Sequence, residues 1–175
     1  ENDPVRVEPI SLGSLDLAAF GRPIDAIQER IDAGSTCIAA LRDGELLGFM
    51  WLQQGTLKER LIRCHMHVEP CSRVVWDYDF FIQPRYRLGR LFGRLWDAAS
   101  ASLRGQGVEA TVSWIRLGNR ASEQAHARLG AKKIGWAIFL NVFGRQVMIT
   151  SFRPCFDYAG LRRTLRLDVD VTERL

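Results

Sequence analysis

Hydrophobic and polar residues follow two different periods along the chain. Period-two alternation rich in β-branched and aromatic residues predicts strands, whereas apolar positions three or four apart predict amphipathic helices. Asp43-Gly44 separates two strand-like runs and is typical of a hairpin turn, and Phe143-Gly144 separates two more. The predicted strands lie within 5–11, 35–55, 61–68, 72–84, 107–117 and 132–152, and the predicted helices within 14–34, 91–103 and 119–130.

This order of elements indicates an α/β fold. Hairpins stand at the beginning and the end, and two strand-helix units follow one another in the second half, so we expect a mixed, mainly antiparallel sheet with a parallel step at the central strands. The clearest helix has apolar residues four apart, which mark one face. That face holds Leu91, Leu95 and Ala99, with Phe92, Trp96 and Leu103 beside them.

The composition is that of an ordinary globular protein. The chain has 175 residues, of which 47% are hydrophobic and 25% charged, so we expect a single domain over 1–175. No run of roughly 18 to 20 apolar residues and no signal-peptide pattern occurs, which favours a cytoplasmic protein with no membrane partner. The segment 153–175 has only a weak apolar pattern, and we assign it no element.

Positive charge is concentrated where one predicted strand passes into a helix. The net charge is only +4, yet arginines stand at 85, 87, 90 and 94. A helix N-terminus offers free backbone N–H groups, arginine binds phosphate oxygens through two N–H groups, and Gly89 lets the backbone approach a ligand closely. The turn therefore predicts a site for a compact anion such as a diphosphate. The alternative is an exposed helix whose arginines only solvate its polar face.

Cysteine and histidine residues give no metal motif. The four cysteines lack zinc-type or redox spacing, so we expect reduced thiols. Cys64, His65, His67 and Cys71 are close in sequence, but in a strand the two histidines point to one face and Cys64 to the other. We expect no metal site.

Two segments resemble the signatures of the GNAT acetyltransferase superfamily. "IQPRYRLGRLFGRL" (82–95) is similar to the strand, the Q/R-x-x-G-x-G/A turn and the leucine-rich helix of that family. "NRASEQAHARLGAKKIG" (119–135) looks like its second signature. The resemblance implies helices on both faces of the sheet. It departs at the turn, where the two glycine positions fall on Arg90 and Phe92, so we expect a reshaped pyrophosphate loop.

The resemblance also implies the co-substrate, acetyl-CoA or another acyl-CoA. The acyl group would pass by direct attack of an amine on the thioester, without an acyl-enzyme. The residues that the resemblance places at the cofactor are Phe80, Ile82, Arg87, Leu88, Gly89, Arg90, Leu91, Phe92, Asn119 and Ser122.

Three residues are candidates for proton transfer. Asp77 and Asp79 alternate on one predicted strand and so would share a face, where two close carboxylates would raise one pKa into the range of a general base. The alternative is that either carboxylate pairs with an arginine of the neighbouring turn, and Glu69 and His67 are reserve bases. His126 stands where the family commonly has a thiolate-protonating tyrosine. It is a candidate proton donor, or else a polar edge of the helix.

The leading functional hypothesis is an N-acyltransferase acting on a small-molecule or peptide amine. A second hypothesis is a long-chain N-acyltransferase that uses acyl carrier protein or acyl-CoA, and a third, ranked lower, is a nucleic-acid-binding module. No DNA-reading motif occurs, so we expect no nucleic-acid partner, and a homodimer is left open. One of several strand aromatics is expected to line the substrate pocket: Trp51, Trp76, Tyr78, Phe80 or Trp114.

Overall fold

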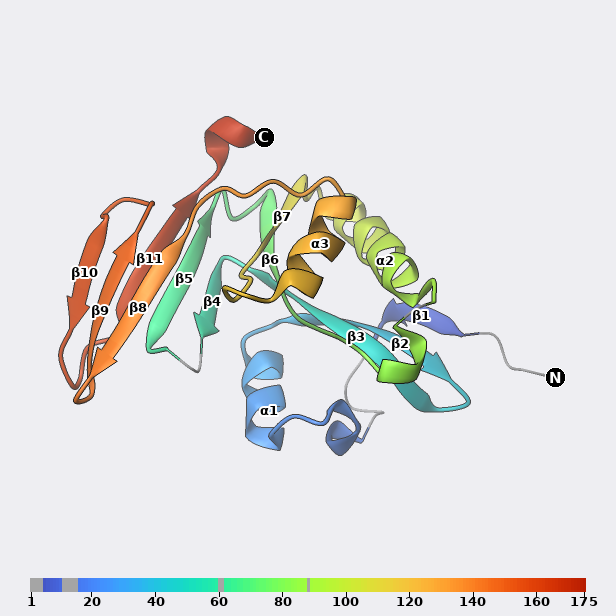
Figure 1. Cartoon of the computed structure of the whole chain (residues 1–175). Coiled ribbons are helices and arrows are strands. Elements are labelled where there is room, and N and C mark those ends of the chain that lie inside the picture. Colours follow the sequence, from blue (N-terminus) through green and yellow to red (C-terminus); the bar gives the residue numbers. More distant parts are fainter. Residues whose placement is uncertain (1–4, 11–15, 60–61, 88) are drawn as a thin grey trace.

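The fold contains three β-sheets with helices packed around the largest of them (Figure 1). The structure is a computed structural model and describes residues 5–10, 16–59, 62–87 and 89–175. Its helices are η2 (Leu17–Phe20), α1 (Ile24–Asp32), η3 (Pro84–Tyr86), α2 (Leu91–Gly105), α3 (Arg120–Arg128) and η4 (Thr172–Arg174). Its strands are β1 (Arg6–Pro9), β2 (Thr36–Arg42), β3 (Glu45–Gln54), β4 (Thr56–Glu59), β5 (Cys64–Glu69), β6 (Val74–Ile82), β7 (Ala110–Ser113), β8 (Ala137–Val142), β9 (Arg145–Thr150), β10 (Phe156–Ala159) and β11 (Leu165–Asp170).

The central sheet has the strand order β1-β2-β3-β6-β7. Its first four strands are antiparallel and β7 is parallel to β6, which confirms the predicted parallel step. Asp43 and Gly44 both have positive φ, 51° and 77°, as a two-residue hairpin turn requires. The predicted hairpin between β2 and β3 is therefore confirmed.

Helices cover both faces of the central sheet, as predicted. On one face, Ile38 and Ala40 pack with the buried α2 stripe, whose members are Leu91, Leu95, Ala99 and Leu103. On the other face, Cys37 and Ala39 pack with Phe20 and with Ile27 of α1. The alternation of residues 37 to 40 between two cores shows that β2 is buried on both sides, which explains its almost continuous apolar sequence.

Two small sheets accompany the central one, whereas the sequence analysis expected a single sheet. One has the order β10-β9-β8 and the other β11-β5-β4, with β11 parallel to β5. The two sheets share one hydrophobic core, to which Met66, Met148 and Leu167 contribute fully or almost fully buried side chains. Figure 1 shows these strands together at the side of the molecule opposite β1. The tail left unassigned from sequence thus supplies β10 and β11, and β4 was also missed.

The cysteine residues form no disulfide bond in the structure. All four cysteines are free thiols, and Cys64 is buried while His65 is exposed, as strand alternation predicts.

No helix in the described ranges is both long and apolar enough to cross a membrane.

Candidate functional site

The central sheet opens between β6 and β7. The two strands pair only from Val74 opposite Ala110 to Asp77 opposite Ser113, whereas β6 continues to Ile82. In the part of the chain that the structure describes, no strand pairs with residues 78–82 on this side of β6. Backbone groups along that edge are available to an extended ligand, as they would be to another strand.

A β-bulge lies at the point where the sheet opens. Phe49 is opposite Phe81 and Trp51 is opposite Tyr78, so the single residue between them on β3 faces two residues on β6, Asp79 and Phe80. Asp79 has a φ of 45°, a left-handed conformation that residues other than glycine rarely adopt. The extra residue reverses the side-chain alternation from this point of the strand onward.

The bulge separates the two carboxylates that were expected to act together. Asp77 points to the face covered by α2 and α3, where it approaches His126, whereas Asp79 points to the α1 face, where it meets Arg22 and Arg30. The predicted shared face is wrong because strand alternation holds only where no residue is inserted.

Asp79 forms an ion-pair cluster with two arginines. Its carboxylate oxygens lie 2.7 Å from Nη2 of Arg22 and 2.6 Å from Nη1 of Arg30. Burial by itself raises the pKa of Asp79, but the hydrogen bonds and positive charges of the two arginines outweigh burial and hold its pKa below the usual value. The expected raised pKa is therefore not found here. Asp79 does pair with arginines, as the alternative interpretation allowed. However, Arg22 and Arg30 do not belong to the 85–94 turn that this interpretation named.

Asp77 occupies a buried position between two strands and a helix. Only 4% of the residue is exposed. The hydroxyl of Ser113, directly opposite on β7, donates to the carboxylate with Oγ 2.7 Å from each oxygen. Nε2 of His126 lies 3.4 Å from Oδ1 of Asp77. Sequence reasoning missed Ser113, because only the parallel register of β6 and β7 brings it to Asp77.

His126 is held from both ends of its ring. Nδ1 lies 2.8 Å from the carbonyl oxygen of Ser122 and donates to it, while Nε2 points to Asp77. The hydrogen bond to Asp77 raises the pKa of His126 above its ordinary value, the Ser122 carbonyl adds to this, and burial opposes it. The indole of Trp96 on α2 packs edge-on to the imidazole, with ring centroids 5.9 Å apart. These contacts favour the imidazolium form of His126, whose ring lies between α2 and α3.

The helix that carries His126 begins as predicted. Asn119 is the N-cap, and its Oδ1 accepts a hydrogen bond from the backbone N–H of Ser122 at 3.3 Å. Ser122 and His126 lie on one helical face, with Oγ 3.4 Å from Nδ1. These contacts fix the start of α3 and the direction of the histidine, while any role toward a cofactor stays a prediction.

The arginine-rich turn divides into engaged and available side chains. Arg85 pairs with Glu45, and Arg94 donates to the carbonyl of Val5. The side chain of Arg87 uses only Nε, which lies 3.0 Å from the carbonyl oxygen of Ile82, and the side chain of Arg90 has no hydrogen-bond or ion-pair partner among the described residues. The Nη groups of Arg87 and the whole guanidinium of Arg90 thus remain available to an anion.

The same turn leads into a helix N-terminus without a side-chain cap. Arg90 is the N-cap residue of α2 and its side chain makes no capping hydrogen bond. The first N–H groups of an α-helix have no acceptor within the helix, so this end carries both free donors and partial positive charge. Leu88 lies outside the described residues.

The remaining predicted cofactor residues divide by burial. Ile82 and Leu91 belong to the α2 core, so only their backbone atoms are available to a ligand. Phe92 packs against Phe80 with ring centroids 5.0 Å apart, and Phe80 stacks on Trp96 at 6.5 Å. These rings form an aromatic wall beside the open edge of β6.

Most of the strand aromatics are structural. Trp51 and Trp76 are buried, Tyr78 contacts the Ser35 hydroxyl at 2.8 Å, and Trp114 packs edge-on to Phe139. Of the aromatics expected to include a pocket residue, Phe80 is the one that faces the α2–α3 side of the open edge. The reserve bases lie elsewhere, because His67 and Glu69 bond each other at 2.8 Å on β5.

Comparison with known proteins gives a family match and several similar folds. A family model described as "Acetyltransferase (GNAT) family" matches residues 12–131. A solved aminoglycoside N-acetyltransferase AAC(6')-Iy in complex with CoA is 18% identical, with a TM-score of 0.62 over 82% of this chain and 97% of that one. An acetyltransferase from Trypanosoma brucei is 17% identical, with a TM-score of 0.56 over 79% of this chain and 100% of that one. No curated protein sequence matches this chain. At these identities the structural likeness concerns the fold.

Proposed function

The chain belongs to the GNAT acetyltransferase family, and from this premise we propose that it is an N-acyltransferase for a small-molecule or peptide amine. In this proposal His126 supplies a proton to the departing sulfur and Asp77 positions His126. Acyl-CoA is the acyl donor of this family and supplies the activated thioester. The observation that carries the proposal is the His126–Asp77 pair at the open end of β6, beside an uncapped helix N-terminus.

Two features beside the open edge of β6 fit an acyl-CoA. The free edge of β6 after Asp77 suits the amides of a pantetheine arm. The indole N–H of Trp96, which packs against both Phe80 and His126, is buried without an acceptor among the described residues. Such a donor costs stability unless a partner arrives, so a carbonyl-bearing ligand between α2 and α3 would relieve it.

The diphosphate would lie at the start of α2. There the first-turn N–H groups of the helix and the guanidinium groups of Arg87 and Arg90 can meet it. Asn119 and Ser122 are committed to the cap and to the histidine, so we propose that they act by orienting His126. Their direct contact with a cofactor is not part of the proposal.

The reaction forms a C–N bond and breaks a C–S bond. The attacking amine loses one proton, which passes to solvent water because no base is assigned to it, and the departing sulfur must gain one. We assign the second transfer to the Nε2–H of His126, whose contact with Asp77 is long at 3.4 Å and would be exchanged for the sulfur, while Nδ1 stays bonded to the Ser122 carbonyl and Asp77 favours the protonated ring. Asp77 is a positioning residue in this scheme. Asp79 is not carried forward as a base, because its low pKa and its two arginine partners leave it little basicity.

No observation favours the other two hypotheses. A basic surface for acyl carrier protein or nucleic acid would need the arginine cluster to be free, whereas Arg85 and Arg94 are engaged within the chain. Some of the similar structures are named as aminoglycoside acetyltransferases, and that name describes those proteins. For this chain we propose an amine as the acceptor and assign no narrower class of substrate.

Thiol release tests the proposed function. The full chain is incubated with acetyl-CoA and longer acyl-CoAs, each with a panel of amino acids, peptides, polyamines and aminoglycosides, and free CoA is measured. We expect saturable release that depends on one class of amine, and mass spectrometry should show the N-acylated product. Failure of every acyl-CoA to bind, measured by calorimetry, would contradict the proposal.

A further inference from the structure

The outer face of the β10-β9-β8 sheet is apolar although nothing in the described structure covers it. An antiparallel sheet with one face on a core normally presents polar side chains on the other. Here the strand register aligns two apolar rows across the three strands. One row is Ile138, Ile149 and Phe156, and the other is Leu140, Val147 and Tyr158.

The neighbouring sheet provides an internal comparison. β11, β5 and β4 share the same hydrophobic core, and their inward residues are buried. Their outward residues are all polar or charged: Thr56, Lys58, His65, His67, Glu69, Arg166, Asp168 and Asp170. Two sheets on one core therefore differ in chemistry on their outer faces, and only the β10-β9-β8 face departs from the normal pattern.

The apolar face is large for an uncovered surface. Phe143 at the β8–β9 turn is 96% exposed, and six residues of the three strands are between 40% and 59% exposed: Ile138, Leu140, Val142, Ile149, Phe156 and Tyr158. Aromatic side chains present roughly 150–250 Å² each and aliphatic ones less, so at these exposures the apolar area of the face and its turn is on the order of 650 Å². The largest patch on a typical monomer is about 300–600 Å², and a stable interface buries about 800 Å² per partner.

We propose that a second copy of this chain covers the β10-β9-β8 face, so that two such faces pack across a two-fold axis. A two-fold interface uses the same patch twice, and a regular sheet face of this area suffices for one. Sheets pack face to face about 10 Å apart through interdigitating apolar side chains, which the two aligned rows provide. The sequence analysis did not decide whether the chain forms a homodimer, and the β10-β9-β8 face is the interface that we propose for one.

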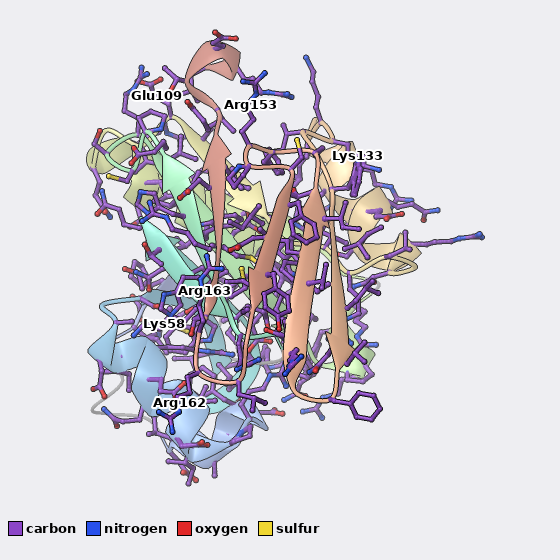
Figure 2. All side chains as sticks on the ribbon, turned by 90° about the vertical axis from the view of Figure 1, so that its left-hand side faces the viewer. Lys58, Glu109, Lys133, Arg153, Arg162 and Arg163 are labelled. Carbon is purple, nitrogen blue, oxygen red and sulfur yellow. The ribbon has the colours of Figure 1, made fainter. Side chains whose placement is uncertain are left out.

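Charge argues for a second copy over an acidic partner. Arg145 lies at one corner of the face, opposite Val142, and Arg163 beside Tyr158 is paired with Asp157, whose Oδ1 lies 2.7 Å from its Nη1. Figure 2 shows the basic side chains of Lys133 and Arg153 toward one end of the sheet and Arg162 toward the other. These charges lie at the rim, so salt should leave the dimer intact or tighten it, whereas it would weaken an ionic interface.

The test is the solution mass of the full chain, independent of acyl transfer. Sedimentation or light scattering should give twice 19.9 kDa at micromolar concentration, at both low and high salt. Ile138→Glu and Leu140→Glu each place a carboxylate in the face and should raise the dimer dissociation constant by more than about tenfold. Both side chains are 50% exposed, so circular dichroism should show an unchanged fold.

Ile24→Glu is the matched control. Ile24 is 59% exposed but lies at the start of α1, outside the face, and its substitution should leave the dimer unchanged. A monomeric wild-type chain at all concentrations would overturn the proposal. So would a dimer that persists in Ile138→Glu and Leu140→Glu, or one that dissociates as salt is raised.

Discussion

Nε2 of His126 lies 3.4 Å from Oδ1 of Asp77, across 49 positions of sequence. One residue comes from a helix and the other from a buried strand, and Ser113 on β7 completes the contacts of the carboxylate. A buried carboxylate beside an imidazole favours the imidazolium, and the hydrogen bond to Asp77 raises the pKa of His126 next to the open edge of β6.

The first prediction concerns the pH dependence of stability. The folded-state pKa of His126 is raised, so its contribution to stability is fully present below the ordinary value of 6.5 and is lost as pH rises through the folded pKa. Chemical unfolding across this range should show that loss for the wild type. In His126→Gln the loss should disappear, and an identical pH profile in the variant would contradict the assignment.

Asp77→Asn should lower the pKa of His126. The amide keeps the size of the carboxylate and can still accept the Ser113 hydrogen bond, but it removes the negative charge that favours imidazolium. The titration of the His126 ring, followed by NMR, measures this directly. His65 is the internal control, because it lies exposed on another sheet and its ring signals should be the same in the two proteins. Equal His126 pKa values in the two proteins would show that the pair is not coupled.

The same variant tests the proposed proton transfer. Asp77→Asn and His126→Ala should each lower kcat by roughly 10²- to 10⁴-fold while CoA affinity changes little, and His126→Ala should remove one limb of the pH–rate profile. Full activity with an unaltered profile would return His126 to a structural role.

CoA affinity should depend on Arg87 and Arg90. Arg87→Ala or Arg90→Ala removes a charge-assisted contact to the diphosphate and should weaken binding by roughly 1–3 kcal/mol, measured by calorimetry. Arg85→Ala is the control, since Arg85 already pairs with Glu45 and should matter less. The proposed diphosphate site is wrong if the Arg87→Ala, Arg90→Ala double variant binds CoA as the wild type does.

Asp79 should matter for stability. Asp79→Asn leaves Arg22 and Arg30 without their carboxylate in a partly buried site, so the free energy of unfolding should fall by about 1–3 kcal/mol. Because the folded-state pKa of Asp79 is depressed, its contribution is present above 3.8 and is lost as pH falls through the folded value. Glu109→Gln is the comparison, since its pair with Arg73 is exposed and should contribute little. Equal denaturation midpoints for both variants would count against the cluster.

Local signals in the sequence determined much of the fold. The four-residue spacing from Leu91 to Leu103 predicted the buried face of α2, Asp43-Gly44 predicted the first hairpin, and the helical pattern within 119–130 predicted α3. Each depends on residues within a few positions, because helix period, turn conformation and capping are properties of the local backbone. The family resemblance was readable for the same reason, since its signatures are short.

Tertiary structure decided which side chains meet. The alternating run Leu165–Asp170 reads in retrospect as a strand, but only its parallel pairing with β5 places it in a core. The inserted residue at Asp79 sent that carboxylate to Arg22 and left Asp77 to Ser113 and His126. Bulges and strand registers depend on which distant segments pack together, and a one-residue shift moves a side chain to the opposite face, so sequence periodicity alone could not fix the site.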